Sequence, residues 1–353
     1  MSRFSLIYES FRLAANPTFE HVLIQEIRYQ DKPLDLSWLI EAVYIETLDL
    51  SGPKLILKLN DREAIFRDDL GIKPFETLMV TLADPYRRDE LDTIEHFVIL
   101  TMPMDAESVL TLNCLSEVIF QLKMPATQAR FFVGEAPESV VKSLVNHTAI
   151  NTSAFPAIED YHLLPGMRPS RLLKQIAREN AAVIYYQRQQ FMFKPISTLL
   201  EKTAHLSYHY NDTRQQNQMV SFKKANADPL IQSFTQRQFI GWHLTQGSLN
   251  ANNTNATASS SAPRELVGFK SPITLANLNT LLTPTLEFTC LGNGALQAGI
   301  ILQLVFNRNH TELPIDESLP DKVIIQSVAH RYSAQKYQCR VKTCLPLNNE
   351  QYH

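Results

Sequence analysis

The sequence predicts a mainly β protein with an α+β middle part, in which two β-barrel-like domains flank a helix-containing domain. Short segments of alternating apolar and polar residues recur at both ends of the chain, as half-buried strands require. Between them, residues 137–146 and 169–179 carry apolar side chains at helical spacing instead. We expect three domains and a short tail, at residues 1–105, 106–200, 201–346 and 347–353.

The first expected domain consists of half-buried strands separated by polar turns. Residues 54–59 show the pattern most clearly, because Leu55, Leu57 and Leu59 fall on one face of an extended chain. Similar patterns occur in residues 19–29, 42–50, 77–82 and 93–100. Several short strands at regular intervals are typical of a barrel or a sandwich.

The middle domain contains the most informative stretch, residues 169–196. Pro169 suits the first turn of a helix, whose inward face is predicted to carry Leu172, Leu173, Ile176 and Ala177. Asn180 is expected to end this helix in a left-handed conformation. Upstream, we expect two strands and one further helix, in residues 109–115, 118–122 and 137–146.

A hairpin is predicted directly after this helix, with strands at residues 183–186 and 191–193 around a polar turn. Its aromatic and basic side chains, among them Tyr186 and Arg188, have the chemistry to stack on nucleic-acid bases. Alternation favours core packing instead, since neighbouring residues of a strand face opposite sides. The predicted core of the middle domain is Leu172, Leu173, Ile176, Ala177, Tyr185, Phe191 and Phe193.

The last expected domain is again rich in strands and includes a polar stretch. Strands are expected in residues 205–210, 219–223, 231–242, 286–291, 300–306, 323–330 and 337–344. Residues 248–263 are of low complexity and too polar to bury much surface, which predicts a flexible loop.

Composition excludes several classes of protein. A net charge of -3 gives no overall bias toward nucleic acid, and 44% hydrophobic residues suffice for packed cores. The four cysteines have neither zinc-ribbon nor disulfide-framework spacing, so we expect buried thiols. The sequence has no apolar segment of membrane-spanning length and no secretory signal, which predicts synthesis in the cytoplasm.

The motifs of catalysis and cofactor binding are weak in this sequence. Gly292, Gly294 and Gly299 precede a strand-like segment, whereas a dinucleotide loop opens a helix. His205 and His209 lie in a strand-like segment without an evident third ligand. We therefore expect no cofactor, no metal ion and no enzymatic activity. Carboxylate pairs leave a cell-wall or glycan hydrolase open as an alternative. They are Asp68-Asp69, Asp89-Glu90, Asp92 with Glu95, and Glu159-Asp160.

Three stretches resemble one known family. The helix LLKQIARE, a tyrosine-rich strand and a return ending in FMFKPI resemble the middle domain of the baseplate hub proteins of contractile phage tails. That family includes the late control protein D group and the hub part of VgrG-like spikes of type VI secretion. Residues 54–82 are similar to its first barrel, and residues 286–306 and 321–344 look like its second.

The resemblance implies a structural protein of the virion, located in the tail baseplate and assembled in the host cytoplasm. It implies a homotrimeric ring of six barrels that adapts a sixfold tail tube to a threefold central spike and surrounds the path of ejected cargo. Expected partners are the tail tube protein, a separate spike protein, a tape-measure protein and other baseplate proteins, with DNA passing without specific binding. A β-rich receptor-binding tail protein is the remaining alternative.

Overall fold

The computed structural model describes residues 23–85, 91–146, 148–225, 237–243, 245, 247–250, 263–308, 315–334 and 336–347. Most of the expected loop at 248–263, part of the expected strand at 231–242 and nearly all of the expected tail lie outside these residues. No helix in the described part of the chain is long and apolar enough to cross a membrane.

The described chain is mainly β, as predicted, and begins with a curved sheet, here called the first sheet. Its strands follow the order β2-β1-β5-β6-β7-β4-β3. They are β1 (Ile24–Tyr29), β2 (Lys32–Pro33), β3 (Leu39–Thr47), β4 (Lys54–Asn60), β5 (Thr77–Ala83), β6 (Asp92–Thr101) and β7 (Val109–Ser116). Short turns of 3-10 and π helix lie between them, at Leu36–Trp38 and Ile65–Asp69.

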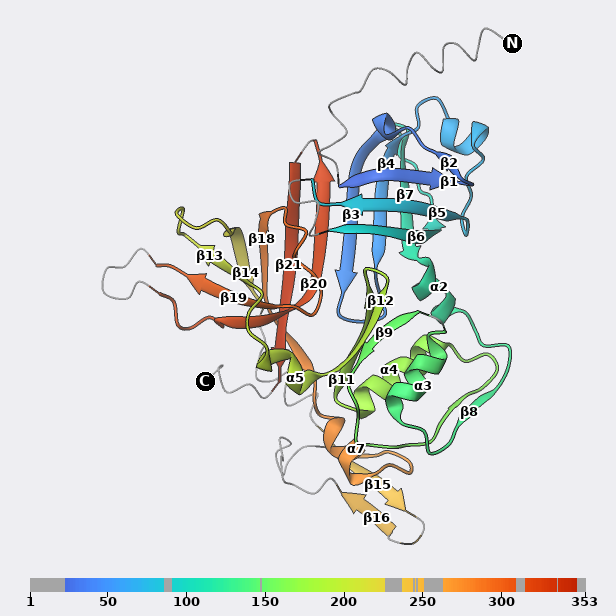
Figure 1. The fold of residues 1–353 in the computed structure, drawn as a ribbon, viewed down its shortest axis with the longest axis vertical. Coiled ribbons are helices and arrows are strands. Elements are labelled where there is room, and N and C mark those ends of the chain that lie inside the picture. The colour runs from blue at the N-terminus through green and yellow to red at the C-terminus, as the bar shows by residue number, and fades with distance from the viewer. Residues whose placement is uncertain are drawn as a thin grey trace.

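The first sheet folds over itself along one strand. β6 pairs with β5 through residues 92–98 and with β7 through residues 97–101, where a register shift bends the strand. As a result β1, β5 and β6 cross over β3, β4 and β7 (Figure 1). β7, which the sequence placed in the middle domain, pairs with β4 through residues 109–115. Apolar alternation predicts a strand but not the strands with which it pairs. Only the pairing with β4 shows that β7 belongs to the first sheet.

A closed six-stranded barrel forms at the other side of the molecule, here called the barrel. Its strands are β13 (Leu206–Tyr210), β14 (Gln218–Lys224), β18 (Leu282–Leu291), β19 (Ile301–Phe306), β20 (Lys322–Ser333) and β21 (Lys336–Pro346). The order β19-β13-β14-β18-β21-β20 closes because β20 also pairs with β19. β20 continues into the first sheet by pairing with β3, so one ladder joins the two β structures (Figure 1).

Between the two β structures along the chain lies a mixed segment, here called the middle unit. It contains α2 (Glu117–Lys123), β8 (Arg130–Phe132), α3 (Pro137–Leu144), β9 (Ala149–Thr152), β10 (Tyr161–Leu163), α4 (Pro169–Glu179), β11 (Ala182–Gln187), β12 (Gln190–Pro195) and α5 (Ile196–Glu201). The expectation of a strand at 118–122 was wrong. These residues form α2, which buries Ile119 and Leu122 at a spacing of three, as one helix face does.

The predicted helix at Pro169 and the hairpin after it are present. Asn180 caps α4 as expected but keeps a φ of -106°. The left-handed residue is the next one, Ala181, with φ +45°. Six of the predicted core residues share one buried cluster, namely Leu172, Leu173, Ile176, Ala177, Phe191 and Phe193. Tyr185 instead packs in a second cluster with Leu48 and Ile324, which belong to the neighbouring β structures. Tyr186, its neighbour in the strand, faces the first cluster.

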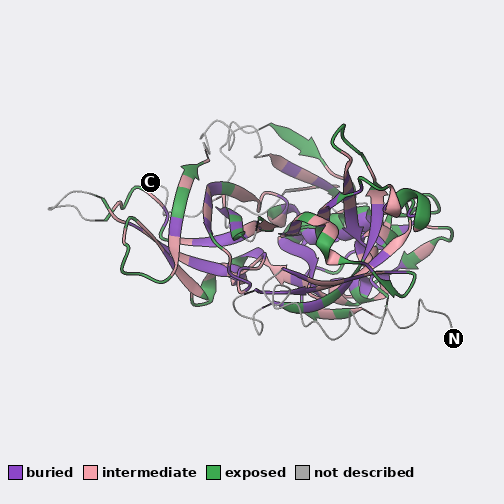
Figure 2. Ribbon diagram, turned by 90° about the horizontal axis from the view of Figure 1, so that it is seen from above, coloured by how far each residue is buried: buried purple, intermediate pink, exposed green. Residues whose placement is uncertain are grey.

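A small sheet and a helix interrupt the barrel segment and lie against the middle unit, and we call them the insert. They are β15 (Gln238–His243), β16 (Gly247–Asn250), β17 (Arg264–Leu266) and α7 (Pro272–Asn277), with the strand order β16-β15-β17. Part of the expected flexible loop, residues 248–250, is therefore strand. Buried residues run through the first sheet and the barrel as one continuous apolar cluster (Figure 2).

Candidate functional site: a polar junction at the hairpin tip

The β11–β12 hairpin ends in a tight turn that points at the seam between the first sheet and the barrel (Figure 1). Gln187 pairs with Gln190, which leaves Arg188 and Gln189 as the two turn residues. Both have positive φ, +45° and +66°, as two-residue hairpin turns with the twist of the strands require. We call these two residues the hairpin tip.

Arg188 connects the hairpin tip to both β structures. Its Nε donates to Glu46 Oε1 on β3 at 3.0 Å, and Nη2 donates to the carbonyl oxygens of Gly294 and Leu296 at 2.7 and 3.2 Å. Glu46 is fully buried, and Tyr44 Oη donates to the same oxygen at 3.2 Å. The guanidinium thus compensates a carboxylate removed from water while satisfying two loop carbonyls.

Gln189 holds the tip to β6. Its backbone N–H donates to Glu95 Oε1 at 3.1 Å, and its side-chain Nε2 donates to the Ile94 carbonyl at 2.6 Å. Tyr186 Oη donates to the other oxygen of Glu95 at 3.4 Å. Burial, reinforced by the nearby Glu46 carboxylate, raises the pKa of Glu95 to about 7, against the two hydrogen bonds, which lower it.

The loop at residues 293–297 meets the tip from the barrel side. Gly294 N donates to Asp84 at the end of β5, and a Cβ at Gly294 would lie 2.8 Å from that carboxylate oxygen. His330 Nε2 lies 3.1 Å from the Leu296 carbonyl, which can only accept, so this nitrogen carries the proton. His330 Nδ1 then accepts from Tyr337 Oη at 2.7 Å. The close approach of backbone and side chains explains the glycine here better than any phosphate-binding role.

Cys339 and His330 have the spacing of a nucleophile and its base, with 3.3 Å between Sγ and Nδ1. Their surroundings do not suit that chemistry. Both side chains are buried, at 1% and 0% exposure, so a substrate has no access to the sulfur. Burial raises the pKa of the Cys339 thiol well above its usual value, which keeps it protonated. The pair belongs to the polar interior of the junction.

The other sequence candidates are spread over the fold. Ser207 Oγ lies 3.0 Å from His209 Nε2, and the described residues contain no group of three or more potential metal ligands from His, Cys, Asp and Glu. Glu159 accepts from Ser271 N and Thr274 Oγ1, at 2.9 and 2.6 Å, and so anchors the insert. Asp68 and Asp69 lie on an exposed turn, whereas Asp89 and Glu90 are outside the described residues.

Sequence reasoning did not find the residues of this junction. It assigned Arg188 only a stacking role, and it named Glu95 only among the carboxylate pairs that left a hydrolase open. A usable signal was present in β3 and the residue after it, where Ala42, Tyr44 and Leu48 occupy buried positions of the alternation. Glu46 falls on the same face, and a charged residue at a core position requires a buried partner.

The fold resembles solved structures of phage tail proteins, although sequence comparison finds no relative. No family model and no curated protein matches the sequence. The described architecture is that of phage tail proteins and of a component of the type VI secretion system, at a level of identity that shows the fold alone.

The similar structures cover almost the whole chain. The tail protein of Neisseria meningitidis MC58 matches with a TM-score of 0.61 and 11% identity, over 90% of this chain and 95% of that one. The 43 kDa tail protein of prophage MuSo2 from Shewanella oneidensis gives 0.58 and 11%, over 90% and 96%. The E. coli c3393 protein, described as a type VI secretion component similar to bacteriophage T4 tail proteins gp27 and gp5, gives 0.52 and 11%, over 92% and 77%.

Proposed function

We propose that this protein is a structural hub of a phage-tail-type injection machine. In this proposal three copies form a ring of six β lobes that adapts a sixfold tail tube to a threefold spike and surrounds the path of ejected cargo. The observation that carries it is the shared fold with a tail protein over 90% of this chain and 95% of the other. The domain division of the sequence analysis, at residues 105 and 200, is retained only as an approximate guide to the lobes.

The joint between the two β structures supports a rigid, two-lobed protomer. The ladder runs from Ser327 opposite Thr47 to Ser333 opposite Glu41, and Arg331 adds an ion pair to Glu41 at 3.1 Å. The hairpin tip then binds both sides of the seam through Glu46, Glu95 and the 293–297 loop. A ring that transmits force between tube and spike needs lobes that do not move relative to each other.

Exposed apolar side chains on opposite flanks provide candidate contacts between protomers. On the barrel, Val220 and Leu291 are 65% and 68% exposed on the neighbouring strands β14 and β18. On the first sheet side, Phe75 is 70% exposed, with its ring 6.3 Å from that of Phe120. A cyclic trimer joins two different surfaces of each protomer, so patches on opposite flanks fit this symmetry.

Measuring the mass of the purified protein at several concentrations tests the ring. A chain of 40.2 kDa predicts a species near 121 kDa, three times that mass. Val220→Glu on the barrel flank is expected to shift the species toward monomer, because it places a charge in an apolar contact. Val133→Glu, at a site 73% exposed on the middle unit, is the matched control. A monomer at every concentration that also ignores added tube and spike proteins contradicts the proposal.

The proposed partners follow from this position in the machine. They are a second and third copy of the chain, the tail tube protein, a central spike protein, and the tape-measure and other baseplate proteins, with DNA passing through unbound. The site of action is the tail baseplate of the virion, after assembly in the host cytoplasm. No enzymatic step is part of the proposal, because the Cys–His pair and Glu46 and Glu95 are occupied within the interior.

A further inference from the structure

The outward face of α4 carries a row of cations, which we call the basic row. Arg168, Arg171, Lys174 and Arg178 are all exposed, and the three within the helix extend over about 10 Å at 1.5 Å per residue. Within the described part of the chain, none of the four side chains forms an ion pair. The row therefore presents positive charge that is offset only at longer range, by the Asp49 carboxylate near Lys174.

Lys123, in the last turn of α2, extends the row toward the first sheet. Its pKa is lowered by burial and then by the positive charge of Lys174, with Lys54 and Arg168 acting in the same direction and Asp49 in the opposite one. These cations are therefore near enough in space to repel one another. Like charges gathered without partners on one face favour a negatively charged partner from outside.

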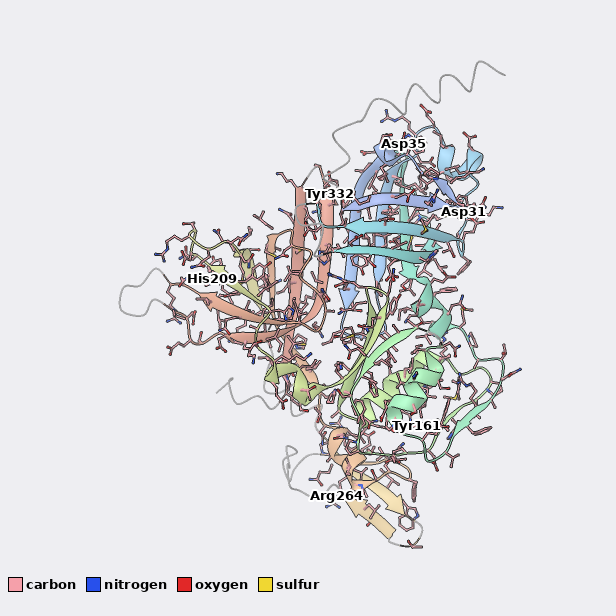
Figure 3. All side chains as sticks on the ribbon, viewed as in Figure 1. Asp31, Asp35, Tyr161, His209, Arg264 and Tyr332 are labelled. Atoms are coloured by element: carbon pink, nitrogen blue, oxygen red, sulfur yellow. The ribbon has the colours of Figure 1, made fainter. Side chains whose placement is uncertain are left out.

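A cavity of about 340 Å³ lies at the other end of the row, between α4 and the insert. Its apolar surface comes from Phe239, Val267 and Leu278, while Lys174 and Arg178 contribute cations. The Arg178 guanidinium lies over the Phe239 ring, 5.7 Å from its centre. The insert that forms this wall, marked by Arg264, lies below the middle unit that carries Tyr161 (Figure 3).

The acidic residues of the cavity are already used within the protein. Glu179 accepts from Lys270 Nζ at 2.8 Å and from Gln175 Nε2 at 3.0 Å. Glu265 lies 3.9 Å from Arg237. Lys174 and Arg178 thus lie beside an apolar surface without an ion pair in the described part of the chain. A ligand that satisfies both features carries a carboxylate next to an apolar side chain.

We propose that the basic row and the cavity beside Arg178 form a docking surface for an extended acidic segment of another protein, which inserts an apolar side chain into the cavity. Two features favour a peptide over a nucleic acid. The cavity is mainly apolar, which suits the side chain of a peptide better than a phosphate backbone. In addition, β17 has described pairing on one side only, to β15, so its other edge can receive an extended chain.

Fluorescence anisotropy with labelled peptides tests this surface on the full-length protein. The probe carries the fluorophore on its amino terminus and an amide at its carboxyl terminus. Its sequence is two glutamates separated by glycine and followed by glycine and phenylalanine. A triple variant, Arg171→Glu, Lys174→Glu and Arg178→Glu, is expected to lower its affinity by at least about tenfold. The control triple, Arg62→Glu, Lys223→Glu and Lys224→Glu, makes the same charge change at exposed cations elsewhere and is expected to lower it less than about threefold.

A second experiment tests whether the cavity receives the apolar side chain of the peptide. Replacing the peptide's phenylalanine with glycine is expected to weaken binding several-fold to the native protein but not to a Val267→Phe variant, whose cavity is filled. Equal losses in the two triple variants, or no effect of the phenylalanine, overturn the proposal. The proposal is also overturned if duplex DNA binds more tightly than the peptide and this binding is lost in the Arg171, Lys174 and Arg178 triple variant. The inference goes beyond the proposed ring, and mass measurements on the same samples report separately on assembly.

Discussion

Arg188→Met is the substitution that most directly tests the junction. It removes the guanidinium that donates to Glu46 Oε1 at 3.0 Å and to the Gly294 carbonyl at 2.7 Å, while keeping a long apolar stem. Glu46 has a side chain with 0% exposure, so water cannot replace the lost partner. Leaving such a buried charge unpaired costs about 3–5 kcal/mol, and we expect the free energy of unfolding to fall by this amount.

The assay is equilibrium unfolding in urea, followed by circular dichroism, on four proteins. The double variant Arg188→Met with Glu46→Gln removes the charge as well as its partner, and we expect it to recover part of the loss, because Gln still accepts from Tyr44 Oη. Arg340→Met is the control, since Arg340 pairs with Glu287 on the barrel surface at 62% exposure. Exposed pairs contribute about 0–1 kcal/mol, so the control should remain near native stability.

Two results would refute this reasoning. In one, Arg188→Met costs no more than Arg340→Met, which would mean that the buried pair contributes nothing beyond a surface pair. In the other, the double variant is no more stable than Arg188→Met alone. The cost would then come from the loop carbonyls rather than from the Glu46 charge.

Three further predictions concern Glu95, Gly299 and the four cysteines. The pKa of Glu95 is about 7 in the folded state, against an ordinary 4.5, so its stabilising contribution is complete below pH 4.5 and is lost as pH rises through 7, by about 3 kcal/mol. When the free energy of unfolding in urea is measured across this range, its decrease with pH should be smaller by that amount in Glu95→Gln, and an unchanged decrease contradicts the assignment. Gly299→Ala places a Cβ 2.2 Å from Tyr185 Oη at φ +82°, and should lower the free energy of unfolding by at least about 3 kcal/mol. The control Gly166→Ala has a similar φ of +83° but no atom within 4 Å of the new Cβ, and should lower it by only about 1–2 kcal/mol. Iodoacetamide should modify the buried cysteines Cys114, Cys290, Cys339 and Cys344 only after unfolding, since burial raises the pKa of Cys114 and of Cys344 to about 12. Fast labelling of the native protein, detected by mass spectrometry, would contradict this.

The elements with a strong local period could be predicted from the sequence. The helix at Pro169 and the hairpin after it follow from spacing, capping and turn residues, all of which act within a few positions along the chain. The same local rules failed at residues 118–122, where β-branched and aromatic side chains suggested a strand. There the burial of Ile119 and Leu122 against the middle unit favours a helix.

Pairing over long distances could not be predicted in this way. The ladder between β3 and β20 joins residues almost 300 positions apart, as in the ion pair of Arg331 with Glu41. The insert likewise departs from the barrel, because Glu159 and Glu179 supply acceptors for Ser271 and Lys270. Alternation identifies which side of a strand is buried, but not what covers it.

The junction was missed for the same reason. Arg188 is one basic residue in a polar turn, and nothing near it in the chain marks it as a partner of Glu46, 142 residues away. Tyr185 and Tyr186 show a partial success, because their opposite orientation was predicted. The faces against which they pack depend on the assembled fold.

An electron microscopy image of the purified protein tests the hub proposal most directly. Three copies, each contributing the first sheet and the barrel as separate lobes, predict a threefold ring with six lobes around an open centre. A compact particle with the dimensions of one 40.2 kDa chain, unchanged when tube and spike proteins are added, would contradict the proposal.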